Sequence, residues 1–219
     1  MTPAERKAFV REHTQVERAP LVPEVPLLLA SEVLPLWQAT EEELHAWGLP
    51  PPFWAFAWAG GQALARWILD NPQEVVGKRV LDFGAGSGLV AIAAAKAGAA
   101  EVTAVDIDPF AAAAIELNAA LNEVELSILT EDLIGRLEGG WEVLLAGDIC
   151  YEKPMAERAF SWLQQLAGRG CRVLLGDPQR TYLPRSGLEL LARYSVKTSR
   201  ELEDSDIRNG AVWRVVPAA

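Results

Sequence analysis

A glycine-rich segment, Val80–Gly88 (VLDFGAGSG), has residue types and spacing suited to binding a nucleotide-like ligand. It joins a short apolar run to an alanine-rich run, so we expect a loop between a strand and a helix. Glycines let such a loop turn tightly and approach a ligand closely, while free N–H groups of the following helix point at that ligand. Gly84, Ala85, Gly86 and Gly88 are therefore candidate cofactor-binding residues.

The spacing of the glycines separates two kinds of cofactor. A dinucleotide loop has the pattern G-x-G-x-x-G, in which two residues separate the second and third glycines. Here only Ser87 separates Gly86 from Gly88, and Leu89 occupies the place of the last glycine. Asp82 precedes the loop, where a carboxylate would repel a pyrophosphate. S-adenosylmethionine has no phosphate, and its sulfonium and ammonium groups suit an acidic residue. The alternative for Asp82 is structural, with its carboxylate capping the helix or stabilising the loop.

Two further acidic residues follow the next apolar runs. Asp106 ends the second run, where a carboxylate can accept two hydrogen bonds from a ribose diol. Capping of the following helix is the alternative, but Asp108 suits that role better. Asp132 is a candidate acceptor for an adenine amino group, with the backbone near Leu133 at the ring edge. An exposed polar turn explains that segment equally well.

The segment Gly147–Glu152 (GDICYE) supplies the candidate catalytic residues. In an open parallel sheet, ligands bind beyond the carboxyl ends of the strands, near the point where the strand order reverses. Asp148 and Tyr151 are therefore expected to face the group that is transferred. A buried tyrosine with a satisfied hydroxyl is the alternative for Tyr151.

Alternating short apolar runs and helical stretches must position these residues. Strands are predicted at Arg79–Phe83, Glu101–Val105, Glu125–Leu129, Trp141–Gly147 and Cys171–Gly176, and helices at Leu89–Ala97, Pro109–Leu121 and Pro154–Ala167. Such βαβ units form a Rossmann-like, mostly parallel sheet with helices on both faces. Two last strands, Tyr194–Leu202 and Ala211–Val216, are predicted to flank the turn Glu203–Gly210 as an antiparallel C-terminal hairpin, which brings the sheet to seven strands.

The first 60 residues stand outside this alternation. They are rich in proline and tryptophan: Pro20, Pro23, Pro26, Pro35, Pro50, Pro51, Pro52, Trp37, Trp47, Trp54 and Trp58. Proline imposes extended or turning backbone, so residues 1–60 are predicted to form an N-terminal extension and residues 61–219 the cofactor-binding domain. A lid that packs aromatics onto the domain and a substrate-recognition role both fit this composition.

Composition limits the class of protein and partner. Thirty acidic and twenty basic residues give a net charge of −10, which repels nucleic acid and favours a basic or lysine-presenting partner. No apolar run is long enough to span a membrane, and residues 1–20 carry no signal or transit pattern, so we expect a cytoplasmic protein of bacterial type. Cys150, Cys171, His13 and His45 do not have the spacing of a disulfide framework or a metal site.

Taken together, the motifs resemble those of the seven-strand class I methyltransferases that modify lysines in proteins. That resemblance is carried by the 82–88 loop, Asp106 and the Asp148-x-x-Tyr151 tetrad. A closer similarity, to the lysine methyltransferases of the electron transfer flavoprotein β subunit, is carried by Pro52–Leu64 (PFWAFAWAGGQAL), Ile107–Pro109 (IDP) and Leu175–Pro178 (LGDP). It extends over most of the chain, including Glu12–Leu29, and departs at Ala59, where many relatives have proline.

The resemblance implies an S-adenosylmethionine-dependent protein-lysine N-methyltransferase without a metal. Its substrate would be the electron transfer flavoprotein β subunit, and a monomer is expected. The cofactor would contact Trp58, Asp82, Gly84, Ala85, Gly86, Gly88, Asp106, Ile107, Asp132 and Leu133. Trp58 would line the pocket, with Gly60 and Gly61 allowing close approach, or else be one more core tryptophan.

Methyl transfer is an in-line displacement, so the acceptor amine needs a free lone pair. A lysine with a reference pKa of about 10.4 must first lose its proton. Asp148 and Tyr151 would hold the neutral amine by hydrogen bonds, without Asp148 being an obligate base. Two alternatives stay open: a methyltransferase for a small-molecule amine, and a non-catalytic regulatory protein that binds S-adenosylmethionine. A nucleic-acid methyltransferase is disfavoured by the acidity and by the absence of an Asn-Pro-Pro-Tyr segment.

Overall fold

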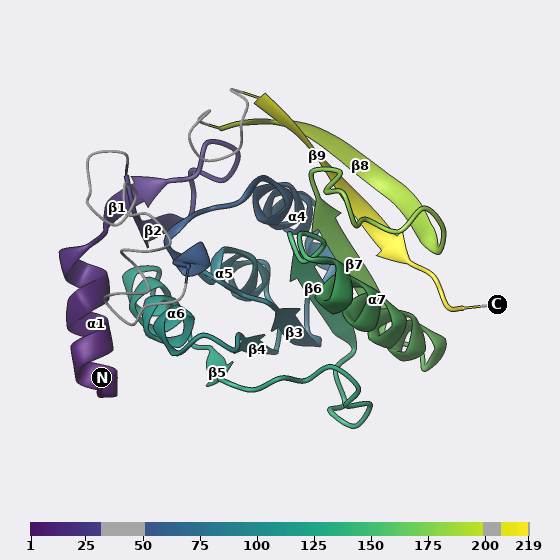
Figure 1. The fold of residues 1–219 in the computed structure, drawn as a ribbon, viewed down its shortest axis with the longest axis horizontal. Helices are drawn as coiled ribbons and strands as arrows, with labels where there is room; N and C mark the ends of the chain where they lie inside the picture. Colours follow the sequence, from purple (N-terminus) through teal and green to yellow (C-terminus); the bar gives the residue numbers. More distant parts are fainter. Residues whose placement is uncertain (32–50, 199–206, 219) are drawn as a thin grey trace.

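The computed structural model describes residues 1–31, 51–198 and 207–218. At its centre is a seven-stranded sheet with the strand order β5-β4-β3-β6-β7-β9-β8 (Figure 1). The strands are β3 (Arg79–Phe83), β4 (Glu101–Val105), β5 (Ser127–Leu129), β6 (Val143–Gly147), β7 (Arg172–Asp177), β8 (Leu188–Lys197) and β9 (Ile207–Val215). Strands β3 to β7 are parallel, and β9 runs antiparallel to both of its neighbours. The predicted sheet with its C-terminal hairpin is confirmed.

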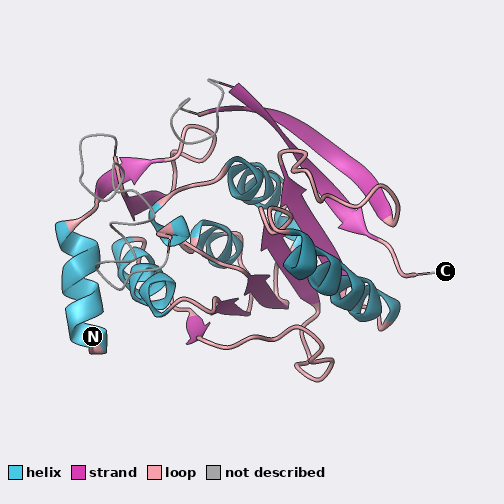
Figure 2. Cartoon of the chain, viewed as in Figure 1, coloured by secondary structure: helices cyan, strands magenta, loops and turns pink. Residues whose placement is uncertain are grey.

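Helices cover both faces of this sheet, as predicted (Figures 1 and 2). One face carries α4 (Ala59–Asp70), α5 (Leu89–Lys96) and α6 (Pro109–Leu121), and the other carries α7 (Lys153–Gly168). Successive strand residues point to opposite faces, so Leu145 packs in the core with α4 and α5, whereas Leu144 packs with α7. The inner parallel strands are therefore largely apolar on both faces, which made them visible in the sequence.

The hairpin differs from the prediction in its bounds. Strand β8 begins at Leu188 rather than Tyr194, and it pairs with β9 from Leu188↔Val215 to Lys197↔Ile207. Its first residues read LELLARY, which does not alternate between apolar and polar residues as a half-buried strand does. The local sequence therefore favours a strand only weakly, and the residues form one because they pair with β9. The rest of the predicted strand and part of its turn lie in residues 199–206, outside the described residues.

The N-terminal residues pack onto the same domain. Helix α1 (Pro3–Glu12) lies against α6, and β1 (Gln15–Arg18) pairs with β2 (Pro26–Leu29) in a small antiparallel sheet. The amide N of Leu28 donates to Asn118 Oδ1 at 2.7 Å, and Asn122 Nδ2 donates to the Pro26 carbonyl at 2.7 Å. Trp37 and Trp47, which the sequence assigns to the N-terminal extension, lie outside the described residues.

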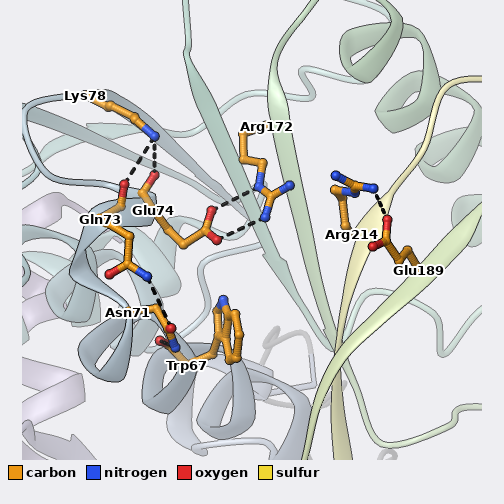
Figure 3. Close-up of polar contacts among 8 residues, drawn as sticks. All are labelled: Trp67, Asn71, Gln73, Glu74, Lys78, Arg172, Glu189 and Arg214. Carbon is orange, nitrogen blue, oxygen red and sulfur yellow. Dashed lines mark hydrogen bonds and ion pairs between the residues drawn. The ribbon is translucent and has the colours of Figure 1, made fainter.

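Polar contacts tie the amino ends of the strands together (Figure 3). The Glu74 carboxylate, in η2 (Pro72–Glu74), accepts hydrogen bonds of 3.0 Å from both Nε and Nη2 of Arg172 at the start of β7. Lys78 Nζ donates to the Glu74 carbonyl at 2.9 Å. These contacts fix the edge of the sheet opposite to the ends where ligands are expected. Among the described residues, no helix is long and apolar enough to cross a membrane.

Candidate active site

A cavity of about 540 Å³ lies at the carboxyl ends of β3, β4 and β6. The strand order reverses here, because the chain passes from β3 outward to β4 and β5 and then returns to place β6 on the other side of β3. Such a switch point is where open parallel sheets bind ligands. The loops after β3 to β7 and the segment before α4 all contribute to the wall.

The cavity brings together most, but not all, of the predicted site residues. Its wall includes Trp58, Gly84, Gly86, Asp106, Ile107, Asp132, Asp148 and Tyr151. Four predicted cofactor-binding residues are not part of the wall: Asp82, Ala85, Gly88 and Leu133. Wall residues that the sequence did not single out include Phe53, Glu131, Ile149, Met155, Arg158 and Arg180.

The loop after β3 needs its glycines for both backbone shape and packing. Gly84 and Gly88 have φ angles of 69° and 82°, in the left-handed region that favours glycine. A Cβ atom on Gly84 would lie 3.2 Å from Ile149 Cγ2, and one on Gly88 would lie 3.3 Å from Ile115 Cγ1. Gly88 therefore serves the packing of α5 against α6 and not the cavity wall.

Asp82 lies beneath this loop and is almost fully buried. Its Oδ2 accepts a hydrogen bond of 2.8 Å from the amide of Ala91, in the first turn of α5. Burial raises the pKa of Asp82 to about 7, although the Ala91 hydrogen bond acts in the opposite direction. The geometry corresponds to the structural alternative, a carboxyl that caps the helix, and a contact of Asp82 with the cofactor stays a prediction.

Asp106 organises the loops on both sides of the cavity. Its Oδ2 accepts from the Gly86 amide at 2.9 Å and its Oδ1 from the Asp108 amide at 3.0 Å. The Ile107 amide is a further backbone donor to this carboxyl, so of the roughly four acceptor sites of a carboxylate one remains for a ligand. Burial raises the pKa of Asp106. Asp108 caps α6, as expected, by accepting from the Phe110 amide at 2.8 Å.

The remaining predicted cofactor residues lie at the far side of the cavity. Asp132 Oδ1 accepts from the Ile134 amide at 2.9 Å, and its Oδ2 pairs with Arg158 at 3.4 Å. The Leu133 side chain is fully buried in the core against α7, which leaves only its backbone for the predicted ring contact. Ile107 is 73% exposed at the rim.

Asp148 is held in an unusual backbone conformation directly after β6. Its φ is 57°, and its amide donates to the Gly176 carbonyl at 2.8 Å. Asp148 Oδ2 accepts from the Gly61 amide at 3.0 Å. Arg180 donates to Asp148 Oδ1 through Nε at 3.0 Å, and its Nη2 lies 2.9 Å from the same oxygen. A carboxylate with this many fixed contacts is a rigid feature of the wall.

Close packing of glycines explains how α4 reaches Asp148. A Cβ atom on Gly60 would lie 2.5 Å from the Gly176 carbonyl oxygen, and one on Gly147 would lie 2.9 Å from Gly61 Cα. Gly60 and Gly147 thus allow close approach of α4 to β6 and β7, whereas the sequence suggested that Gly60 and Gly61 allow close approach to the cofactor. The start of α4 thereby packs directly against Asp148, a candidate catalytic residue.

Aromatic side chains line the entrance next to Asp148. Trp58 Nε1 donates to the Phe53 carbonyl at 2.9 Å, and the Phe53 and Tyr151 ring centroids are 5.3 Å apart. Tyr151 is 48% exposed, so it is not the buried tyrosine of the alternative interpretation. Burial of part of its surface raises the pKa of Tyr151 and keeps its hydroxyl protonated. The site can thus offer a hydroxyl, a carboxylate and apolar walls to a long amine side chain.

Arg180 was missed by sequence reasoning. It follows Asp177 and Pro178 at the end of β7, a strand adjacent to β6, and this position was the one available signal. Asp177 Oδ1 accepts from the Arg180 amide at 2.7 Å, and burial raises the pKa of Asp177 to about 6. Within the described residues, no group of three or more His, Cys, Asp and Glu side chains is placed to hold a metal ion.

Known proteins resemble this chain over nearly its whole length. The electron transfer flavoprotein beta subunit lysine methyltransferase of Xenopus laevis is 39% identical to it, over 96% of this chain and 87% of the relative. The Homo sapiens protein of the same name is 37% identical, over 97% of this chain and 83% of the relative. The profile of the ribosomal protein L11 methyltransferase family matches residues 65–147.

Solved structures share the fold at low sequence identity. Magnesium protoporphyrin IX methyltransferase from Synechocystis with bound S-adenosylmethionine is 20% identical, with a TM-score of 0.51, and the match covers 69% of this chain and 76% of that one. The Pyrococcus abyssi tRNA (uracil-54, C5)-methyltransferase with S-adenosyl-L-homocysteine is 14% identical, with a TM-score of 0.58, over 93% of this chain and 44% of that one. These similarities concern the fold alone.

Proposed function

The chain belongs to the family of the electron transfer flavoprotein β subunit lysine methyltransferases, and we propose that it methylates a lysine of that flavoprotein subunit with S-adenosylmethionine. The single observation that carries the proposal is the identity of 39% over nearly the whole chain. Its cavity supports the same activity, because Asp106 from the loop after β4 and Asp148 and Tyr151 from the loop after β6 converge there.

Residues on the cavity wall have the chemistry to hold S-adenosylmethionine. The remaining acceptor position of Asp106 suits a hydroxyl of a ribose diol, and Asp132 lies on the wall where an adenine amino group would be met. When bound, this cofactor supplies a methyl carbon that is transferred to nitrogen while the C–S electron pair returns to sulfur. Gly84 and Gly86, which lie on the cavity wall, leave room for its close approach.

The other end of the cavity suits a lysine side chain. Phe53, Trp58 and Tyr151 provide apolar walls for the four-carbon stem. The Tyr151 hydroxyl and the Asp148 carboxylate lie on the wall of the same cavity, and they would orient the amine. Orientation and proximity supply most of the acceleration in such a transfer, and solvent accepts the proton that the amine must lose.

The N-terminal extension, residues 1–60, has a substrate-facing part in this proposal. Phe53 and Trp54 from that segment contribute to the cavity wall, and Trp54 stacks on Phe110 of α6 with centroids 6.2 Å apart. We infer that the extension selects the protein substrate. The enzyme would act as a cytoplasmic monomer, without nucleic acid, consistent with its net charge of −10.

A labelling experiment tests this function. The purified chain is incubated with S-adenosylmethionine labelled on the methyl group and with the electron transfer flavoprotein β subunit of the same organism, and peptides are analysed by mass spectrometry. Label on a lysine of that subunit is the expected result. Label only on small amines would establish the rival activity, and cofactor binding without any transfer would establish a regulatory protein. Calorimetry should show binding of S-adenosylmethionine and none of NAD.

A further inference from the structure

Arg180 and Asp148 form an ion pair on the wall of the cavity, and the proposed function gives Arg180 no role. We propose that Arg180 is a positioning residue that fixes the Asp148 carboxylate and makes the site accept the substrate lysine as a neutral amine rather than as an ammonium ion. The inference rests on the proposed function, since it concerns the acceptor of that same transfer.

The position of Arg180 is set from several sides. Asp177 accepts a hydrogen bond from its amide at 2.7 Å, and Gln179, just before it, has a φ of 68°, which turns the chain sharply after β7. The guanidinium carbon lies 5.6 Å from the centre of the Trp58 ring, a distance typical of a cation–π contact. The side chain of Arg180 is 21% exposed and that of Asp148 is 7% exposed. Arg180 is therefore a fixed cation and not a mobile surface arginine.

A fixed cation beside Asp148 changes what that carboxylate can bind. Both guanidinium contacts are to Oδ1, and Oδ2 already accepts the Gly61 amide. A lysine ammonium reaching Asp148 would meet the positive charge of Arg180 within the same partly desolvated space, where like charges repel strongly. A neutral amine meets no such repulsion, and it is also the form that can attack a methyl group.

The other ionisable groups near Asp148 in the described part of the chain are acidic or uncharged. Burial raises the pKa of Asp177 to about 6, so near neutral pH this carboxyl is still mostly ionised, and it accepts a hydrogen bond from the Arg180 amide. Burial raises the pKa of the Cys150 thiol and keeps it neutral. Asp106 lies in the same cavity, and burial raises its pKa as well. Tyr151 keeps a protonated hydroxyl. Arg180 is thus the fixed cation in direct contact with the candidate catalytic carboxylate.

The pH dependence of kcat tests this role, because it reports groups that ionise in the enzyme–substrate complex. For Arg180→Gln, the rising limb of the plot of kcat against pH should move to higher pH by about one unit. The variant should therefore have a kcat about tenfold lower than wild type at neutral pH and a similar kcat at alkaline pH. Arg180→Lys retains the charge and should keep the limb near its wild-type position. Arg180→Met, a second neutral variant that retains an apolar stem, should behave like Arg180→Gln. Arg79→Gln, at the opposite edge of the sheet, is the matched control.

Proton release gives a readout without turnover. The electron transfer flavoprotein β subunit is titrated into the enzyme saturated with S-adenosylhomocysteine, by calorimetry in two buffers of different ionisation enthalpy. Wild-type enzyme should release more protons on binding than Arg180→Gln, which would accept the ammonium form. Equal proton release and an unmoved kcat limb in both neutral variants would overturn the inference. Failure of wild-type enzyme to methylate the subunit would instead overturn the proposed function.

Discussion

The amide of Ala91 donates a hydrogen bond of 2.8 Å to Oδ2 of Asp82. This bond joins the end of β3 to the first turn of α5, so the glycine loop between them is held at both of its ends. The carboxyl is almost fully buried, and burial raises its pKa to about 7, from an ordinary value of 3.8. A loop that shapes the cavity thus depends on a group that titrates near neutral pH.

Asp82→Asn should make the free energy of unfolding less dependent on pH. Between pH 3.8 and about 7, the folded carboxyl holds its proton while the unfolded one has lost it. The folded state then binds more protons, so the contribution of Asp82 is full at low pH and is lost as the pH rises towards neutral, by at most about 1.4 kcal/mol per unit. Asparagine cannot titrate, and its Oδ1 can still accept from Ala91.

Urea unfolding at several pH values between 4 and 8 measures this slope. Asp177, whose pKa is raised to about 6, acts in the same direction and remains in the variant, so the slope should decrease without vanishing. The half-exposed Asp70 provides a control substitution, Asp70→Asn. If Asp82→Asn and wild type lose stability equally over this range, Asp82 is already ionised in the folded protein.

Asp148→Asn should abolish most of the transfer while the fold persists. Asparagine tolerates the left-handed backbone that the φ of 57° requires, whereas alanine would cost about 1 kcal/mol more there. Losing the carboxylate removes one partner of Arg180 and one acceptor for the amine, and we expect kcat to fall by about 10²-fold or more. Single-turnover assays with quantified S-adenosylmethionine binding would check this. Near-normal turnover would remove Asp148 from the mechanism.

Asp106→Ala should weaken binding of S-adenosylmethionine by about 1 to 3 kcal/mol, or about 5- to 150-fold in Kd. The carboxylate already accepts from the amides of Gly86 and Asp108, so the variant also loosens the loops that frame the cavity. Asp108→Ala separates these effects, because it uncaps α6 without removing the predicted ribose acceptor. Titration calorimetry on both variants gives the comparison. An unchanged Kd in Asp106→Ala would exclude the ribose role.

Much of the fold could be predicted because its inner strands and helices carry strong local signals. Strands β3 and β4 have the predicted bounds, since short apolar runs buried on both faces stand out between polar loops. Helix α6 also has its predicted bounds, because Asp108 and Pro109 mark its start. Helix α4 was not predicted. Gly60 and Gly61 disfavour a helix locally, and packing against β6 and β7 outweighs that preference.

Only part of the candidate site could be predicted from the sequence. Asp106 and Asp148 follow directly after strands, and Tyr151 lies in the same short loop as Asp148, so the strand ends indicate their location. The partner of Asp148 could not be found in this way, because Arg180 comes from a loop that the strand order, and not the sequence, brings beside β6. Asp82 illustrates another difficulty. Its position in the motif predicts a ligand contact, which stays a prediction, and the sequence did not decide between that contact and the hydrogen bond that Asp82 accepts from the Ala91 amide.

Gly60→Ala and Gly61→Ala form a matched pair that tests how closely α4 must approach the strands. A Cβ atom on Gly60 would lie 2.5 Å from the Gly176 carbonyl oxygen and 2.6 Å from Asp148 Oδ2. Backbone cannot yield easily there, so we expect a loss of about 1 to 3 kcal/mol in the free energy of unfolding. A Cβ atom on Gly61 would have its nearest neighbour, Val90 Cγ2, at 3.9 Å, which is ordinary contact. Gly61→Ala should therefore be neutral or stabilising.

Thermal unfolding followed by circular dichroism distinguishes the two variants, with roughly 2 to 4 °C in Tm for each kcal/mol in a chain of this size. Methyl transfer should fall in Gly60→Ala beyond what its stability explains, because displacement of α4 would move the Gly61 amide away from Asp148. In Gly61→Ala that amide is retained, and the rate should stay within a few-fold of wild type. Equal stability and equal rates in both variants would mean that α4 can shift without disturbing Asp148.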